Sequence, residues 1–145
     1  MKSAMATVTL LSLIGAGDAG KADLQRMQGM WQVVFLEIDG KAAGDKEKDA
    51  PIKVFVAGND FFTTFADKPL TAGKLTLDAA QSPGYIDAEQ TKGPWKGMTQ
   101  LGLYEIKGEE MKIIWAEPNK ERPKSFKTQA GTGQVLLAYK RVKEK

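Results

Sequence analysis

The sequence predicts an all-β fold, an antiparallel up-and-down β-barrel of about eight strands with a short N-terminal helical turn. From residue 31 onward, short runs rich in β-branched and aromatic residues recur about every 8–15 residues, separated by turn residues. No helical pattern of ten or more residues lies between these runs, as a parallel βαβ fold would need. Sequential hairpins over this length favour a closed barrel, because closure removes exposed sheet edges.

The elements follow one another in a simple order. Residues 23–28 indicate a short helical turn with Asp23 as its N-cap. The first strand ends at Asp39-Gly40, a dipeptide typical of hairpin turns, and the polar residues 41–50 indicate a loop. Leu75 and Leu77 alternate with polar residues, which places both leucines on one face of their strand. The predicted strands are residues 31–38, 52–57, 61–65, 74–78, 85–88, 99–106, 111–116, 124–128 and 134–141.

The residue types that are missing restrict the chemistry. The chain has 145 residues, a length that fits one domain, and it contains no Cys and no His. It therefore lacks disulfides, thiolate nucleophiles, Ser-His-Asp triads and metal sites built on those residues. We expect that the protein is not an enzyme and uses no cofactor or metal. The alternative is a hydrolase based on carboxylates alone, which needs two acids facing one cleft about 5–10 Å apart.

The charge pattern argues against a nucleic-acid partner. Lys and Arg number 21, Asp and Glu 18, and the formal net charge is +3. Basic residues are interleaved with acids, as in residues 46–49 and 120–122, and no unbroken basic stripe is present. Trp95 beside Lys96, in a loop containing Gly and Pro, is an exception to this ordinary surface. It is either a lid or partner contact, or an apolar side chain folded back as a plug.

The first 19 residues predict a secretory signal peptide. Lys2 gives a basic start, residues 4–16 are uncharged and mostly apolar, and small residues at 17 and 19 form a cleavage signal. The apolar run is shorter than the roughly 20 residues of a membrane-spanning helix. The alternatives are a packed N-terminal helix or an uncleaved anchor. We expect cleavage after Ala19 or Ala22, a barrel domain over residues 23–143, export to the periplasm or exterior, and no stable membrane insertion afterwards.

Two positions at opposite ends of the chain sharpen the barrel prediction. Gly29 and Trp31 open the first strand, and Arg141 ends the last one. This pattern resembles lipocalins and related calycin barrels, in which a late Arg packs across the Trp of a Gly-x-Trp. Cation–π stacking and hydrogen bonds from the guanidinium to backbone carbonyls would close one end of the barrel. The alternative is an ordinary core Trp and an unrelated surface Arg.

An ordered set of blocks extends this likeness from residue 24 to residue 141. The blocks cover residues 24, 28–34, 37, 39–41, 86–87, 96–97, 101–109, 111–113, 116, 121–123, 126 and 140–141. In these blocks the chain resembles a small lipocalin-like domain family of unknown function that recurs in planctomycete-type bacteria. Its members often have Cys where Ile114 stands and Asp where Glu109 or Glu110 stands. The resemblance implies a secreted lipocalin-like barrel and no established activity.

Together these observations predict a barrel that binds a small, mostly apolar ligand in its interior. Arg122, which precedes Pro123, is expected to offer a guanidinium to a carboxylate or phosphate at the mouth of the barrel. The alternative is that Arg122 pairs with a carboxylate such as Asp87 or Glu105 and fixes its own loop. The predicted ligand contacts are Val54, Leu75, Leu103, Tyr104, Ile113, Trp115 and Arg122, and Val56, Leu77 and Met111 are further predicted lining residues.

A second function is compatible with the same sequence. A barrel whose interior is filled by side chains would have no pocket and would act through its loops as a protein-interaction or structural module. An interior cavity of about 300 Å³ or more favours ligand binding over this alternative. The sequence leaves the ligand, any protein partner and the oligomeric state open.

Overall fold

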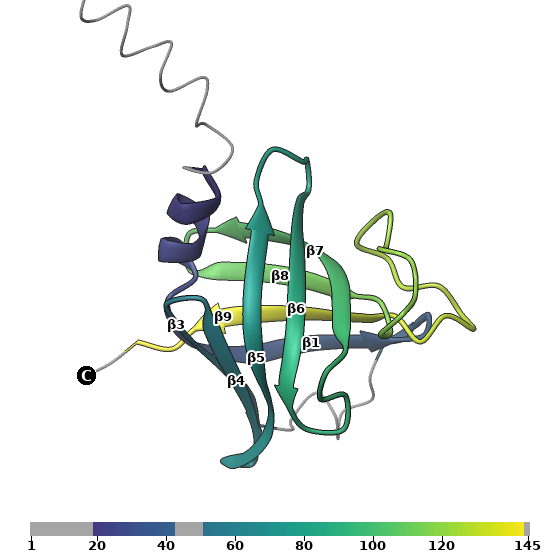
Figure 1. The fold of residues 1–145 in the computed structure, drawn as a ribbon, viewed down its shortest axis with the longest axis horizontal. Coiled ribbons are helices and arrows are strands. Elements are labelled where there is room, and N and C mark those ends of the chain that lie inside the picture. The colour runs from purple at the N-terminus through teal and green to yellow at the C-terminus, as the bar shows by residue number, and fades with distance from the viewer. Residues whose placement is uncertain (1–18, 43–50, 144–145) are drawn as a thin grey trace, which may run out of the picture.

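The computed structural model describes residues 19–42 and 51–143 and confirms the predicted fold class. Its antiparallel strands follow the order β2-β1-β3-β4-β5-β6-β7-β8-β9, and β1 also pairs with β9, which closes a barrel of eight strands (Figure 1). The two-residue β2 extends from β1 as a hairpin. The strands are β1 (Gly29–Ile38), β2 (Lys41–Ala42), β3 (Ile52–Ala57), β4 (Asp60–Phe65), β5 (Lys68–Asp78), β6 (Gly84–Lys92), β7 (Thr99–Lys107), β8 (Glu110–Trp115) and β9 (Val135–Arg141).

A helix over residues 19–26 precedes β1 and is longer than the predicted turn. Asp23 therefore lies inside the helix and is not its N-cap. The predicted signal peptide falls on residues 1–18, outside the described residues, except for Ala19. Among the helices of the described residues, none is long and apolar enough to cross a membrane.

The register of the strands decides which side chains fill the barrel. Trp31 and Val33 of β1 point inward, and an irregularity between Val33 and Phe35 shifts the alternation, so that Leu36 also faces the cavity. The buried interior cluster consists of Met27, Trp31, Val33, Val54, Val56, Phe61, Leu75, Ile86, Ala88, Tyr104, Met111, Ile113 and Tyr139. This cluster includes the predicted lining residues Val56 and Met111, and Leu77 packs against it.

The antiparallel order gives the barrel two different ends. We call the end that holds the helix and the start of β1 the closed end; it also contains the turns at 58–59, 79–83 and 108–109. The opposite end, which we call the open end, contains the turn at 66–67, the loop 93–98 and the long loop 116–134 (Figure 1). The side chains at these two ends determine where the barrel interior is sealed and where it is accessible from outside.

The predicted strand at 124–128 is wrong, because these residues form an irregular part of the 116–134 loop. The barrel strands pair with their two neighbours along most of their length, and the short β2 takes the remaining edge at the end of β1, so residues 124–128 have no strand to pair with. The loop instead packs on the outer wall. There Phe126 covers a second apolar cluster of Leu103, Ile114 and Leu136.

Candidate functional site

The barrel interior contains a cavity of about 310 Å³. Its lining comes from all eight barrel strands, together with Met27 and Trp95, and includes no charged side chain. Four of the predicted ligand contacts line this cavity: Val54, Leu75, Ile113 and Trp115. The alternation of apolar residues therefore located much of the lining correctly.

Leu103 was predicted to line the interior, and this prediction is wrong. Leu103 packs on the outer wall against Ile114, while its neighbour Tyr104 joins the interior cluster. Both faces of this part of β7 are apolar, so the pattern over Leu103 and Tyr104 alone is ambiguous. A longer window carries the missing signal: Glu105 shares the face of Leu103, and Ile106 shares the face of Tyr104.

Arg122 was also predicted as a ligand contact, but it lies outside the barrel. Its guanidinium stands 4.1 Å from the centre of the Tyr85 ring and donates a hydrogen bond to the Gly102 carbonyl oxygen at 2.8 Å. It also forms a 2.8 Å ion pair with Asp87. Arg122 thus fixes the 116–134 loop against β6 and β7, as the structural alternative supposed.

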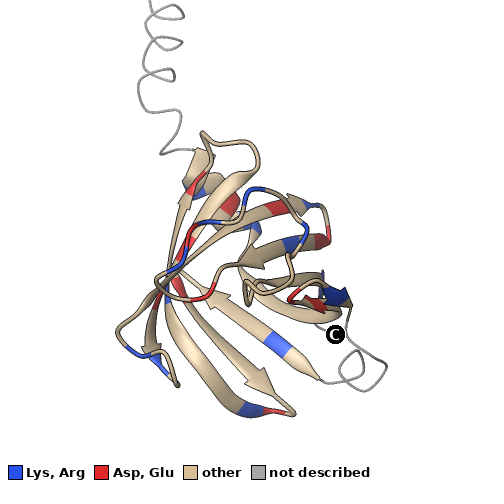
Figure 2. Ribbon diagram, turned by 90° about the vertical axis from the view of Figure 1, so that its right-hand side faces the viewer, with Lys and Arg blue, Asp and Glu red and all other residues tan. Residues whose placement is uncertain are grey.

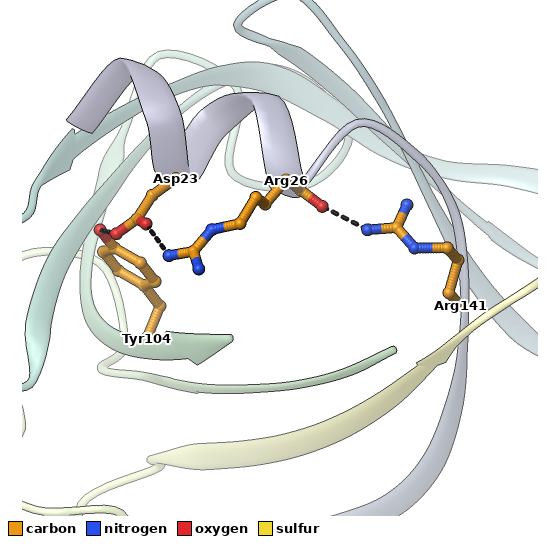
Figure 3. Close-up of polar contacts among 4 residues, drawn as sticks. All are labelled: Asp23, Arg26, Tyr104 and Arg141. Carbon is orange, nitrogen blue, oxygen red and sulfur yellow. Dashed lines mark hydrogen bonds and ion pairs between the residues drawn. The ribbon is translucent and has the colours of Figure 1, made fainter. Parts of the chain in front are cut away.

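Tyr104 serves the closed end and does not line the cavity. Its hydroxyl donates to Asp23 Oδ2 at 2.5 Å, and the same carboxylate pairs with Arg26 of the helix (Figure 3). Burial, and then the hydrogen bond to the Asp23 carboxylate, raise the pKa of Tyr104 above its ordinary value of 10.0. The phenol therefore stays protonated at neutral pH and anchors the helix to β7.

Trp31 plugs the closed end. Its side chain is completely buried, and its indole Nε1 donates to the Met27 carbonyl oxygen at 2.9 Å. The Arg141 guanidinium lies over the indole, 4.3 Å from the ring centre. The Gly-x-Trp and the late Arg thus lie together in the fold. Arg141 also contacts Gln28, the residue before the motif, from which it is 113 sequence positions away.

Hydrogen bonds hold the Arg141 guanidinium in this position. It donates to the backbone carbonyl oxygen of Gln28 at 2.6 Å and to that of Arg26 (Figure 3), and it pairs with Glu109 at 3.2 Å. Gly29 has a φ of +106°, and a Cβ there would lie 3.4 Å from an Arg141 nitrogen. Glycine at this position therefore lets the chain turn from the helix into β1 directly beneath the guanidinium.

A pair of glutamines provides polar groups in the cavity wall. Gln100 Nε2 donates to the Ala116 carbonyl oxygen at 3.2 Å, so Gln100 Oε1 is left to accept from Gln90 Nε2 at 2.7 Å. Because a backbone carbonyl only accepts, this chain of bonds fixes both amide orientations. Gln90 Oε1 is then a buried acceptor without a hydrogen-bond partner among the described residues. Sequence reasoning missed both glutamines, although Gln90 continues the inward face of Ile86 and Ala88.

Exposed apolar side chains lie at the open end, and we call them the rim: Ile38, Phe65, Leu70, Trp95 and Met98. Three of them, Ile38, Leu70 and Trp95, also line the cavity. Gly93 brings the Trp95 loop close to β5, because a Cβ there would lie only 2.9 Å from the Leu70 carbonyl oxygen. Trp95 therefore lies at the mouth of the cavity, in contact with it and still partly exposed.

These features define a class of protein: a closed antiparallel β-barrel with one plugged end and an uncharged cavity that reaches an apolar rim at the other. No protein-family model, curated protein or solved structure matches the chain. The resemblance to the lipocalin-like family stays a prediction. In the part of the chain that the structure describes, no group of three or more His, Cys, Asp or Glu residues could hold a metal ion.

Proposed function

We propose that this chain is an exported, lipocalin-like carrier, without enzymatic activity, that binds a small neutral apolar molecule in its barrel. The observation that supports this proposal is the interior cavity of about 310 Å³ with no charged side chain in its lining. A charged ligand would lose its hydration there without meeting an opposite charge, which is strongly unfavourable. The same cavity favours ligand binding over a filled barrel that acts only through its loops.

The size of the cavity bounds the ligand. An apolar protein cavity of about 150 Å³ binds benzene, so roughly twice that volume suits a molecule of about a dozen non-hydrogen atoms. The hydroxyl-bearing side chains Thr63, Thr71 and Tyr139 also line the cavity. Burial raises the pKa of Tyr139, so its phenol remains a neutral hydrogen-bonding group. A mostly apolar ligand with one neutral polar group fits this lining best.

Calorimetric titration with two probes of nearly equal size tests the proposal. We expect 1-octanol to bind and octanoate at neutral pH to bind at least about tenfold more weakly, because octanoate would bury its charge. Native mass spectrometry of protein from its own host compartment should show a small neutral molecule bound. A bare protein that binds neither probe would favour the interaction module instead.

A pair of variants links binding to the cavity. Leu75→Phe adds a ring to the lining and should weaken octanol binding at least fivefold. Thr76→Phe places the same ring on the neighbouring exposed position of β5 and is the matched control. Thermal unfolding of both variants checks that each of them folds. Equal octanol binding by the wild type and Leu75→Phe would place the ligand outside the barrel.

A further inference from the structure

The rim has the composition of a surface that rests on a lipid bilayer. Ile38, Leu70 and Trp95 expose 44%, 46% and 37% of their area while also lining the cavity. An exposed Trp at the edge of an apolar patch is typical of the membrane–water interface, where its ring lies at the level of the lipid headgroups. Rim and cavity form one continuous apolar path from the surface into the barrel.

Lysines flank this apolar path. Lys68 lies in the hairpin of Leu70, and Lys92 and Lys96 bracket Trp95; all three are exposed. The only acid in residues 66–70 and 92–98, Asp67, faces Lys53 of β3 at 3.7 Å. Figure 2 shows blue on hairpin ends at the lower edge of the barrel, with a red segment directly beside the blue on the lowest of them. The two segments that carry Leu70 and Trp95 are therefore apolar, with an excess of lysine beside the apolar side chains.

We propose that the rim docks on the surface of an anionic lipid bilayer, so that the barrel opens directly into the membrane. The lysines would lie among the anionic headgroups, and Trp95 and Leu70 would enter the interface beneath them. An apolar molecule dissolved in the bilayer could then pass into the cavity without crossing water. Docking on a bilayer is a property separate from the proposed ligand binding. It requires no ligand in the cavity, and it can be tested without one.

Binding to lipid vesicles tests the proposal with the full chain. We expect co-sedimentation with vesicles of 70% phosphatidylcholine and 30% phosphatidylglycerol, and at least about tenfold weaker partitioning to pure phosphatidylcholine. Trp31 is buried and Trp115 lies in the barrel wall, so a brominated lipid should quench the fluorescence of Trp95. Equal, weak partitioning to both vesicle types would overturn the proposal.

Matched variants distinguish the contribution of the rim to vesicle binding from that of the overall positive charge of the chain. A lysine near an anionic surface contributes about fivefold to partitioning, so Lys92→Glu/Lys96→Glu should lower it at least about 25-fold. Lys21→Glu/Lys143→Glu makes the same change of charge at the closed end and should have little effect. Trp95→Ser should lower partitioning at least fivefold, whereas Phe62→Ser, an exposed apolar position on the wall of β4, should not.

Size-exclusion chromatography with light scattering tests the other possible occupants of the rim. We expect a monomer whose mass does not change in Trp95→Ser. A dimer that Trp95→Ser dissociates would mean that a second copy covers the rim, and this result would overturn lipid docking. Octanol binding by a variant that no longer binds vesicles would show that docking and ligand binding are separate properties, as the proposal requires.

Discussion

At the closed end of the barrel Trp31 and Met27 have no exposed surface, whereas Leu70 and Trp95 at the open end expose 46% and 37% of theirs. At the closed end, hydrogen bonds tie the helix to the barrel: the Arg141 guanidinium donates to two backbone carbonyl oxygens, and the Tyr104 hydroxyl donates to Asp23. The two ends belong to the same closed sheet, so the sheet itself does not require the difference. Apolar side chains at the closed end are buried and stabilise the fold. Those at the open end stay exposed and are available for contact with another molecule.

Of the variants that test this difference between the ends, Trp31→Ala should lower the free energy of unfolding most. Removing a fully buried Trp costs about 3–5 kcal/mol of unfolding free energy and leaves Arg141 without its aromatic partner. Urea unfolding measures the loss. Trp95→Ala at the open end is the control and should change stability by less than about 0.5 kcal/mol. Equal losses for the two variants would mean that the ends do not differ in stabilising the fold.

Arg141→Met should have the next largest effect. It keeps an apolar stem but removes the hydrogen bonds to the Gln28 and Arg26 carbonyls, for an expected loss of about 2–3 kcal/mol. Lys140→Met, at the neighbouring exposed position, removes the same charge and should be nearly neutral. If both variants unfold at the same urea concentration, the closed end is held by apolar packing alone.

Gln100→Leu tests how much the hydrogen bonds of the cavity wall near the open end stabilise the fold. The change removes the bond to the Ala116 carbonyl oxygen and leaves Gln90 without its acceptor, which we expect to cost about 1–2 kcal/mol. Urea unfolding is again the measurement, and Gln129→Leu, in the exposed loop, is the control. A neutral or stabilising result would show that the cavity wall tolerates an entirely apolar lining.

Glu37→Gln should have the smallest effect, and one that depends on pH. Hydrogen bonds from the Thr128 hydroxyl and backbone N–H lower the pKa of Glu37 below its ordinary value of 4.5. A lowered folded-state pKa adds stability above pH 4.5 that is lost as the pH falls through the folded value. The variant should therefore be less stable than the wild type at pH 6, and the difference should shrink as the pH falls below 4.5. A difference that stays constant across these pH values would contradict this origin.

Much of the fold could be predicted because period-two alternation and turn residues recur along most of the chain. The start of β5 was missed, since Pro69 and Gly73 resemble turn residues although both lie within the strand. Gly73 is needed there because a Cβ would lie 2.1 Å from the Glu89 carbonyl oxygen of β6. The sequence shows that a glycine is present, but the neighbour that requires it appears only after the strands are paired.

The site was less predictable than the fold. Alternation divides a strand into two faces, but it does not say which face points inward when both are apolar, as at Leu103 and Tyr104. The position of Arg122 depends on Asp87 and Tyr85, which are distant in sequence. Trp31 and Arg141 were paired correctly because a family resemblance supplied the long-range contact that local patterns lack.

The pairing of β1 with β9 also bears on how the chain folds. Contacts such as Arg141 with Gln28, 113 positions apart, are among the slowest to form, because the loop between them must be closed before the contact stabilises anything. Until β9 is in place, β1 and β8 each have an unpaired edge. We therefore expect barrel closure to be a late step in folding, on a timescale of milliseconds to seconds, and the open-edged intermediate to be the species most prone to aggregation.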